Sequence, residues 1–285
     1  AERLRAWGFN CLGVGSSPSL RRRGLAWMEI LGMGAAWARR DPITKPTTWT
    51  GFPNVFSPDF ARFCDKEAAR LCAPLRTDPW LVGYFIDNEL EWHPWTGKGP
   101  FADSLAKPAG HGAREALVRL MHERHGTVES FNAAWRTALP GLEGISGTAW
   151  GPDPPTDAAR DDVRAFLRLA AERYFSVAAA AIRKHDPNHM VMGCRFAGQA
   201  PDILDIAGKY CDVFSVNCYR NLDLGTGKMT DGFEDELREW HSRTGLPLII
   251  HARDADEDMA RILSEEHRAG AYACVMHCFS SGRAL

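Results

Sequence analysis

The chain has 285 residues, a formal net charge of -2 at pH 7, 45% hydrophobic residues and 25% charged residues. This length and composition argue against a disordered chain and suit one large α/β domain, or two small ones, with a well-filled core. The near-neutral charge argues against nucleic acid or an acidic membrane as the main partner, and no apolar run is long enough to cross a bilayer.

The start of the chain bears on its processing, and its cysteines bear on the redox state of its compartment. The first residue is Ala1 and no signal peptide is visible, so we expect a processed, trimmed or fragmentary chain. Eight cysteines lie in apolar contexts without a C-x-x-C pair, which favours buried free thiols in a reducing compartment. Cys274, His277 and Cys278 could share a helix face and hold a metal, but we expect no metal site because no second ligand cluster accompanies them.

The first third of the chain alternates apolar runs with helical patterns. We expect the end of a helix at residues 1–7, strands at 9–14 and 25–33, a long loop at 35–56 and a helix at 58–75.

The stretch from Trp80 to Trp92 organises the rest of the chain. An apolar run from Trp80 to Ile86 breaks abruptly into Asp87-Asn88-Glu89, which is typical of a strand buried on both faces of a parallel sheet. Barrel enzymes carry their chemistry at the carboxyl ends of such strands. Trp92 and Trp95 follow at once, and flat aromatic rings beside carboxylates suit a sugar-binding cleft.

The remaining residues continue the alternation. We expect strands at 190–194, 211–216 and 246–250, and helices at 113–124, 127–135, 157–185, 203–210, 233–243 and 256–279. Thr127 is a candidate helix cap, and Asp186-Pro187-Asn188 ends the longest helix.

Strands that alternate with helices predict a parallel sheet. Arg195, Asn217, Tyr219 and His251 all follow predicted strands, at the same end as Glu89. This pattern favours an α/β fold of the (β/α)8 TIM-barrel type in a single domain over residues 1–285, and no glycine-rich nucleotide motif follows any strand.

The order of several motifs resembles glycoside hydrolase clan A, and within it the family 50 β-agarases and family 42 β-galactosidases. The motifs are Trp7-Gly8-Phe9-Asn10, Phe52-Pro53-Asn54-Val55-Phe56, the run from Asp78 to Glu89, the segments 125–135 and 182–196, and Asp212 to Asn217.

The resemblance implies a retaining glycosidase that acts on β-linked, galactose-containing polysaccharide or oligosaccharide, needs no cofactor and belongs to carbohydrate metabolism. It makes Glu89 the general acid/base, gives Asn88 a hydrogen bond to the sugar 2-hydroxyl, and makes Tyr219 the candidate to orient the nucleophile. Its members are often secreted, so the localisation stays open, as does the oligomeric state.

The sequence departs from the family pattern in two ways. If the strand before Glu89 is the fourth of eight, strands one and eight are not evident, and we expect a barrel truncated at both ends. Ala252 stands where the family has its nucleophilic Glu, which leaves Asp254 or Asp256 as the second carboxylate for a retaining or an inverting mechanism. The alternative is a catalytically impaired relative that binds carbohydrate.

Several residues allow two interpretations. Trp92, His93 and Trp95 could form a sugar platform or pack a long loop on itself, and we expect Glu91 to face solvent. Arg195 and Tyr219 could line the cleft together with Asn217, or only brace their surroundings. His251 and Asp254 could form a metal or base pair, although a lone His after a strand is more often structural.

Overall fold

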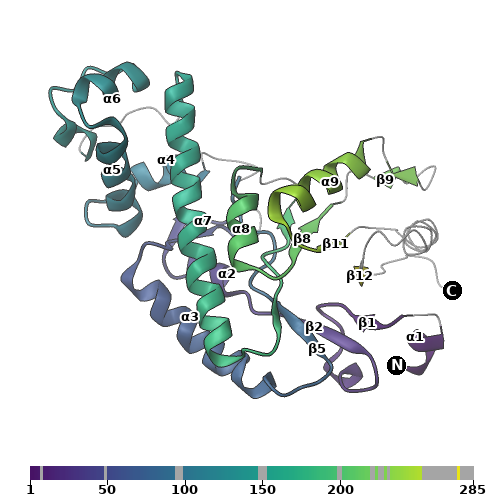
Figure 1. The fold of residues 1–285 in the computed structure, drawn as a ribbon. Coiled ribbons are helices and arrows are strands. Elements are labelled where there is room, and N and C mark those ends of the chain that lie inside the picture. Colours follow the sequence, from purple (N-terminus) through teal and green to yellow (C-terminus); the bar gives the residue numbers. More distant parts are fainter. Residues whose placement is uncertain are drawn as a thin grey trace.

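The computed structural model describes residues 1–6, 9–47, 50–93, 99–146, 153–197, 201–218, 222–223, 228–229, 232–251 and 275–276. Its main feature is a set of parallel strands with helices packed outside them (Figure 1). The strands of this set are β1 (Cys11–Leu12), β2 (Ala26–Ile30), β5 (Leu81–Phe85), β6 (Met190–Val191), β7 (Phe196–Ala197), β8 (Phe214–Asn217), β11 (Leu248–His251) and β12 (Val275–Met276).

These strands form two parallel sheets, in the orders β1-β2-β5-β6 and β12-β11-β8-β7. Residues 190–197 join them, because β6 pairs with β5 while β7 pairs with β8. Between β6 and β7 the backbone stays bonded to β5: Met192 N donates to Tyr84 O at 2.8 Å, and Ile86 N donates to Gly193 O at 2.7 Å. The two sheets therefore continue as one parallel arc, which the described residues do not close into a barrel.

The concave side of the arc has its own small core. It consists of one apolar side chain from or beside each of five neighbouring strands: Met28, Phe85, Met192, Val213 and Ile249. Side chains from five strands meet only if the sheet curls, so this cluster is the interior layer of a barrel-like arrangement.

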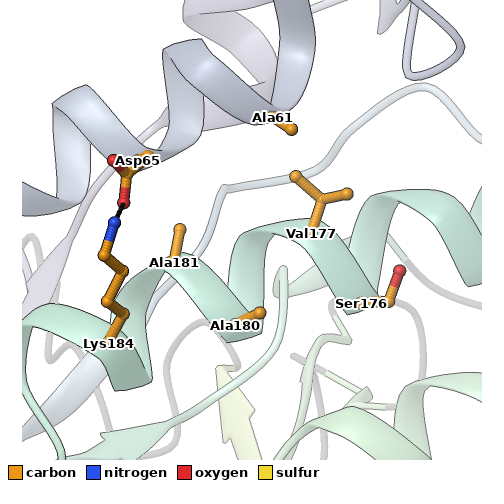
Figure 2. A pocket seen from close by; sticks show the side chains of 7 residues that line it. All are labelled: Ala61, Asp65, Ser176, Val177, Ala180, Ala181 and Lys184. Carbon is orange, nitrogen blue, oxygen red and sulfur yellow. Dashed lines mark hydrogen bonds and ion pairs between the residues drawn. The ribbon is translucent and has the colours of Figure 1, made fainter. Parts of the chain in front are cut away.

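The outer side of the arc carries the main core and its helices. These are α1 (Glu2–Ala6), α2 (Met33–Ala38), α3 (Pro58–Leu71), α7 (Asp157–His185), α8 (Leu204–Tyr210) and α9 (Phe233–Thr244). A hollow of about 320 Å³ lies between α3 and α7 (Figure 2), lined by Ala61, Asp65, Ser176, Val177, Ala180, Ala181 and Lys184. None of the described candidate site residues lines it.

A helical insert separates β5 from β6. Its helices are α4 (Gly99–Leu105), α5 (Gly112–His125) and α6 (Val128–Trp135), and they gather around one end of α7, away from β2 and β5 (Figure 1). The insert has its own apolar cluster, which includes Phe101, Phe131 and Phe166. The buried carboxylate of Asp162 on α7 accepts from Arg124 Nε at 2.6 Å and Trp135 Nε1 at 2.8 Å, which fixes α5 and α6 to α7.

Most of the predicted elements are confirmed. Residues 157–185 are one helix, and Thr127 caps α6 by accepting from Ser130 N at 3.3 Å. The six described cysteines are free thiols. The described residues include no helix long and apolar enough to span a membrane. The single-domain assignment stays a prediction.

One predicted element is wrong, and a second is wrong at its described residues, since 256–274 and 277–279 lie outside the described ranges. Residues 35–56 are not one loop, since they contain most of α2 and the antiparallel pair β3 (Pro42–Thr44) and β4 (Phe52–Pro53). Within the predicted helix 256–279, Val275 and Met276 form the strand β12, which pairs in parallel with β11. This is the place of the eighth strand that the sequence did not reveal, whereas no strand precedes β1 in the described residues.

Candidate active site

The carboxyl end of β5 brings Asn88 and Glu89 against Asn217, the last residue of β8. Asn217 Nδ2 donates to Glu89 Oε1 at 2.6 Å and to Asn88 Oδ1 at 3.2 Å. Asn217 is buried, and its own Oδ1 has no protein partner among the described residues. A single amide group therefore ties together the two residues that the motif singled out.

The backbone of Glu89 is held in an unusual conformation. Its φ is +52°, in the left-handed region that residues other than glycine rarely adopt, and the residue is 8% exposed. Its N–H is shared between the carbonyl oxygens of Cys194 and Arg195, both at 3.2 Å. Its carbonyl accepts from Thr50 Oγ1 at 2.7 Å. Backbone strain of this kind persists only where the surroundings fix it, and it is concentrated at functional sites.

Asp87 has a structural role beside the site. Its buried carboxylate accepts from the backbone N–H groups of Gly34 at 2.6 Å and Ala35 at 2.9 Å, and from Tyr174 Oη at 2.7 Å. These contacts fix the start of α2 and a residue of α7 to the end of β5. Burial raises the pKa of Asp87 to about 6, although the three donors oppose this rise by stabilising the carboxylate.

Glu91 does not face solvent, so that expectation is wrong. The residue is 4% exposed, and its carboxylate accepts from the backbone N–H groups of Thr47 and Gly51 and from the Thr47 hydroxyl. The physical reason is that Thr47 and Gly51, which lie between β3 and β4, come close to Glu91 and supply donors to its side chain.

His251 ends β11, as predicted, whereas Arg195 lies between β6 and β7 and directly precedes β7; β8 lies between β7 and β11. Arg195 has a φ of +44°, its N–H donates to Ser215 Oγ at 3.0 Å, and its guanidinium lies 5.6 Å from the ring centre of Phe85. His251 is the register partner of Asn217 in the parallel pair β8–β11. Because the Glu89 N–H also donates to Arg195 O, the residues Glu89, Arg195, Asn217 and His251 lie close together along one edge of the arc.

Trp92 does not offer a ring face to a sugar, which corrects the platform interpretation for this residue. It is 3% exposed and packs against other aromatic rings, with Phe52 at 4.8 Å, Tyr174 at 5.5 Å and Phe175 at 5.8 Å between ring centres. Burial of its apolar surface in the core stabilises the fold more than exposure in a solvent-filled cleft would, so the chain after Glu91 turns inward.

Other predicted residues lie outside the described ranges. These are Trp95, Tyr219, Ala252, Asp254, Asp256, Cys274, His277 and Cys278. Among the described residues, no three His, Cys, Asp or Glu side chains are grouped as metal ligands would be.

Three residues that hold the site were missed in the sequence. Thr50 binds the Glu89 carbonyl, Tyr174 binds Asp87, and Ser215 Oγ accepts from Arg195 N while donating to Met192 O at 2.6 Å. Thr50 and Tyr174 are far from their partners in the chain, and single hydroxyl residues carry no local signal. Ser215 sits two residues before Asn217 on β8, and only that strand position hinted at its role.

The chain is similar in sequence to β-agarases, and it is similar in fold to structures of β-agarases and β-galactosidases. Beta-agarase A of Vibrio sp. (strain JT0107) is 26% identical over 242 residues, which are 77% of this chain and 24% of that protein. An exo-beta-agarase structure matches with a TM-score of 0.69 and 25% identity, over 88% of this chain and 34% of that one. A beta-galactosidase from the psychrophilic Marinomonas ef1 shares the fold, with a TM-score of 0.65 and 13% identity over 97% of this chain and 50% of that one.

The chain matches only part of each agarase, and its last segment matches another family. The chain spans about a quarter of the length of the curated agarases it matches. Residues 234–285 match the model of a different family, TatD related DNase. Ala252 and Asp254 both lie inside this segment.

Proposed function

We propose that this chain carries the acid/base half of a glycoside hydrolase that cleaves β-linked, galactose-containing polysaccharide or oligosaccharide. The observation that carries the proposal is the contact of Asn217 with both Asn88 and Glu89 at the carboxyl ends of β8 and β5. Active sites of barrel enzymes lie at this end of the strands. The agarase relatives support the choice of substrate.

In the proposed reaction Glu89 donates a proton to the glycosidic oxygen as the bond to the anomeric carbon breaks. Asn88 binds the sugar 2-hydroxyl, and Asn217 holds both side chains in place. Arg195 and His251, with Trp95 and Tyr219, contribute to binding the sugar. A retaining mechanism places a second carboxylate about 5–5.5 Å from Glu89 as nucleophile, and an inverting one places it roughly 6.5–9.5 Å away. Asp254 is the candidate for this group.

A second candidate function is sugar binding without turnover. Two observations favour it: Ala252 stands at the expected nucleophile position, and the surrounding segment matches a family other than the agarases. A chain with a working acid/base and no second carboxylate binds substrate but does not complete the displacement.

Hydrolysis assays on agarose oligosaccharides and aryl β-galactosides test both candidates, with calorimetry to measure binding. We expect turnover that Glu89→Gln lowers by about 10²- to 10⁴-fold, the usual contribution of a general acid/base. Glu115→Gln is the control, because Glu115 accepts a backbone N–H from Gly110 at the exposed start of α5. Binding without turnover supports the second candidate. The absence of both binding and turnover would overturn both candidates.

A further inference from the structure

The carboxylate of Glu91 is buried against donors from one short segment. Thr47 N donates to both of its oxygens at 3.1 and 3.0 Å, the Thr47 hydroxyl donates to Oε2 at 2.5 Å, and Gly51 N donates to Oε1 at 3.1 Å. In return, the backbone N–H of Glu91 donates to Gly51 O at 3.1 Å. The side chain and the backbone of one residue thus hold both Thr47 and Gly51.

The chemistry of this contact calls for a carboxylate. Thr47 and Gly51 present N–H and O–H donors to the side chain, and an ionised Glu is an acceptor at both oxygens. A buried charge is costly unless such donors surround it, so the arrangement is stable only with the segment in place. Gly51 has a φ of +68°, and a Cβ there would lie 2.6 Å from Thr44 O, so Gly51 approaches Thr44 too closely for a side chain.

The same segment reaches Glu89. Thr50, next to Gly51, donates its hydroxyl to the Glu89 carbonyl at 2.7 Å, and Glu89 holds a left-handed backbone. We propose that Glu91 is a positioning residue for the acid/base, which fixes Thr47 and Gly51 so that the Thr50 hydroxyl holds the Glu89 backbone in its strained conformation. The proposal rests on the proposed function only for its effect on turnover.

Amide exchange measured by NMR on the full chain tests the structural part without any substrate. Glu91→Gln places an amide NH₂ group opposite the segment's donors, so exchange at the Thr47 and Gly51 amides rises about ten- to hundredfold, the effect of losing a hydrogen bond to a charged group. Exchange in the middle of α7 stays as in the wild type. Glu115→Gln is the matched control and changes exchange only near Gly110. Unchanged exchange at Thr47 and Gly51 in Glu91→Gln would overturn the proposal.

A second variant guards against loss of folding. If Glu91→Gln does not fold, Thr47→Val removes one hydroxyl donor to the carboxylate and keeps the shape of the side chain. Faster exchange at Gly51 in this variant supports the proposal, and unchanged exchange contradicts it.

Turnover tests the link to Glu89 through the pair Thr50→Ser and Thr50→Val. Serine keeps the hydroxyl and valine keeps the shape, so kcat falls at nearly constant KM in Thr50→Val and recovers in Thr50→Ser. Equal kcat values for the two variants would overturn the link. An inactive wild type would instead overturn the proposed function, and the exchange data would still decide whether Glu91 holds the segment.

Discussion

Asn217 Nδ2 lies 2.6 Å from Glu89 Oε1, so the last residue of β8 holds the side chain of the proposed acid/base that follows β5. The two residues are far apart in sequence, and parallel strands bring them to the same edge of the arc. A hydrogen bond to a charged group is worth about 1.5–3 kcal/mol, and this one also fixes the direction of the carboxylate.

We therefore expect Asn217→Ala to lower kcat about ten- to hundredfold, because Glu89 and Asn88 lose the donor that holds them. KM changes little if the contact acts on Glu89 rather than on the bound sugar. Steady-state kinetics on an aryl β-galactoside measure both constants. Asn188→Ala is the control, because the Asn188 amide donates to Arg76 O at the surface. A rise in KM with constant kcat would instead assign Asn217 to substrate binding.

Asp87 makes the stability of the fold depend on pH. Its pKa is raised from 3.8 in the unfolded chain to about 6 in the folded protein. Between these two pH values the folded state keeps a proton that the unfolded chain has released. The contribution to stability is full below about pH 4 and is lost as the pH rises to about 6. The shift corresponds to about 3 kcal/mol. Urea unfolding between pH 4 and 8 measures this loss.

Tyr174→Phe sharpens the test of Asp87. The Tyr174 hydroxyl stabilises the carboxylate, so its removal raises the pKa of Asp87 further and extends the loss of stability to higher pH. Tyr210→Phe is the control, since the Tyr210 hydroxyl binds Glu172 near the surface. A pH profile of Tyr174→Phe that parallels the wild type would contradict the assignment of this dependence to Asp87.

Substitution of Trp92 tests whether its side chain packs in the core or forms a platform for a sugar. Because its ring is buried among Phe52, Tyr174 and Phe175, we expect Trp92→Ala to lower the free energy of unfolding by about 3–5 kcal/mol. Trp80 is 40% exposed, and Trp80→Ala serves as the control, with an expected effect of about 0.5 kcal/mol. Chemical denaturation gives both values. A stable Trp92→Ala protein with weakened sugar binding would restore the platform interpretation.

The sequence predicted the features of the fold that depend on a local residue pattern. The apolar run before Asp87 identified β5 and the place of Glu89, and Asp186-Pro187 marked the end of α7, because proline restricts the residue before it. The partners of each side chain depend on contacts between distant segments, and these were not predictable. Glu91 looked like an exposed loop residue because its donors, Thr47 and Gly51, lie some forty positions earlier.

Short elements were missed for a related reason. β3 and β4 have three and two residues, too few to show a period, and they exist because they pair with each other. β12 lies within residues whose spacing also suits a helix, and pairing with β11 decides in favour of a strand. Tertiary pairing overrides local propensity in both cases.

The role of Ala252 is open to a chemical test. If Ala252 occupies the place of a nucleophilic carboxylate, a small anion such as azide fits the space that the shorter side chain leaves. Azide then attacks the anomeric carbon of an aryl β-galactoside, the bond to the aryl oxygen breaks, and Glu89 supplies the proton to that oxygen. In that case turnover occurs only with azide, NMR detects an α-galactosyl azide as the product, and this product is lost in Glu89→Gln. Ala252→Glu restores hydrolysis without azide. If neither change produces turnover, Ala252 does not stand at the nucleophile position, which agrees with the match of residues 234–285 to a different family.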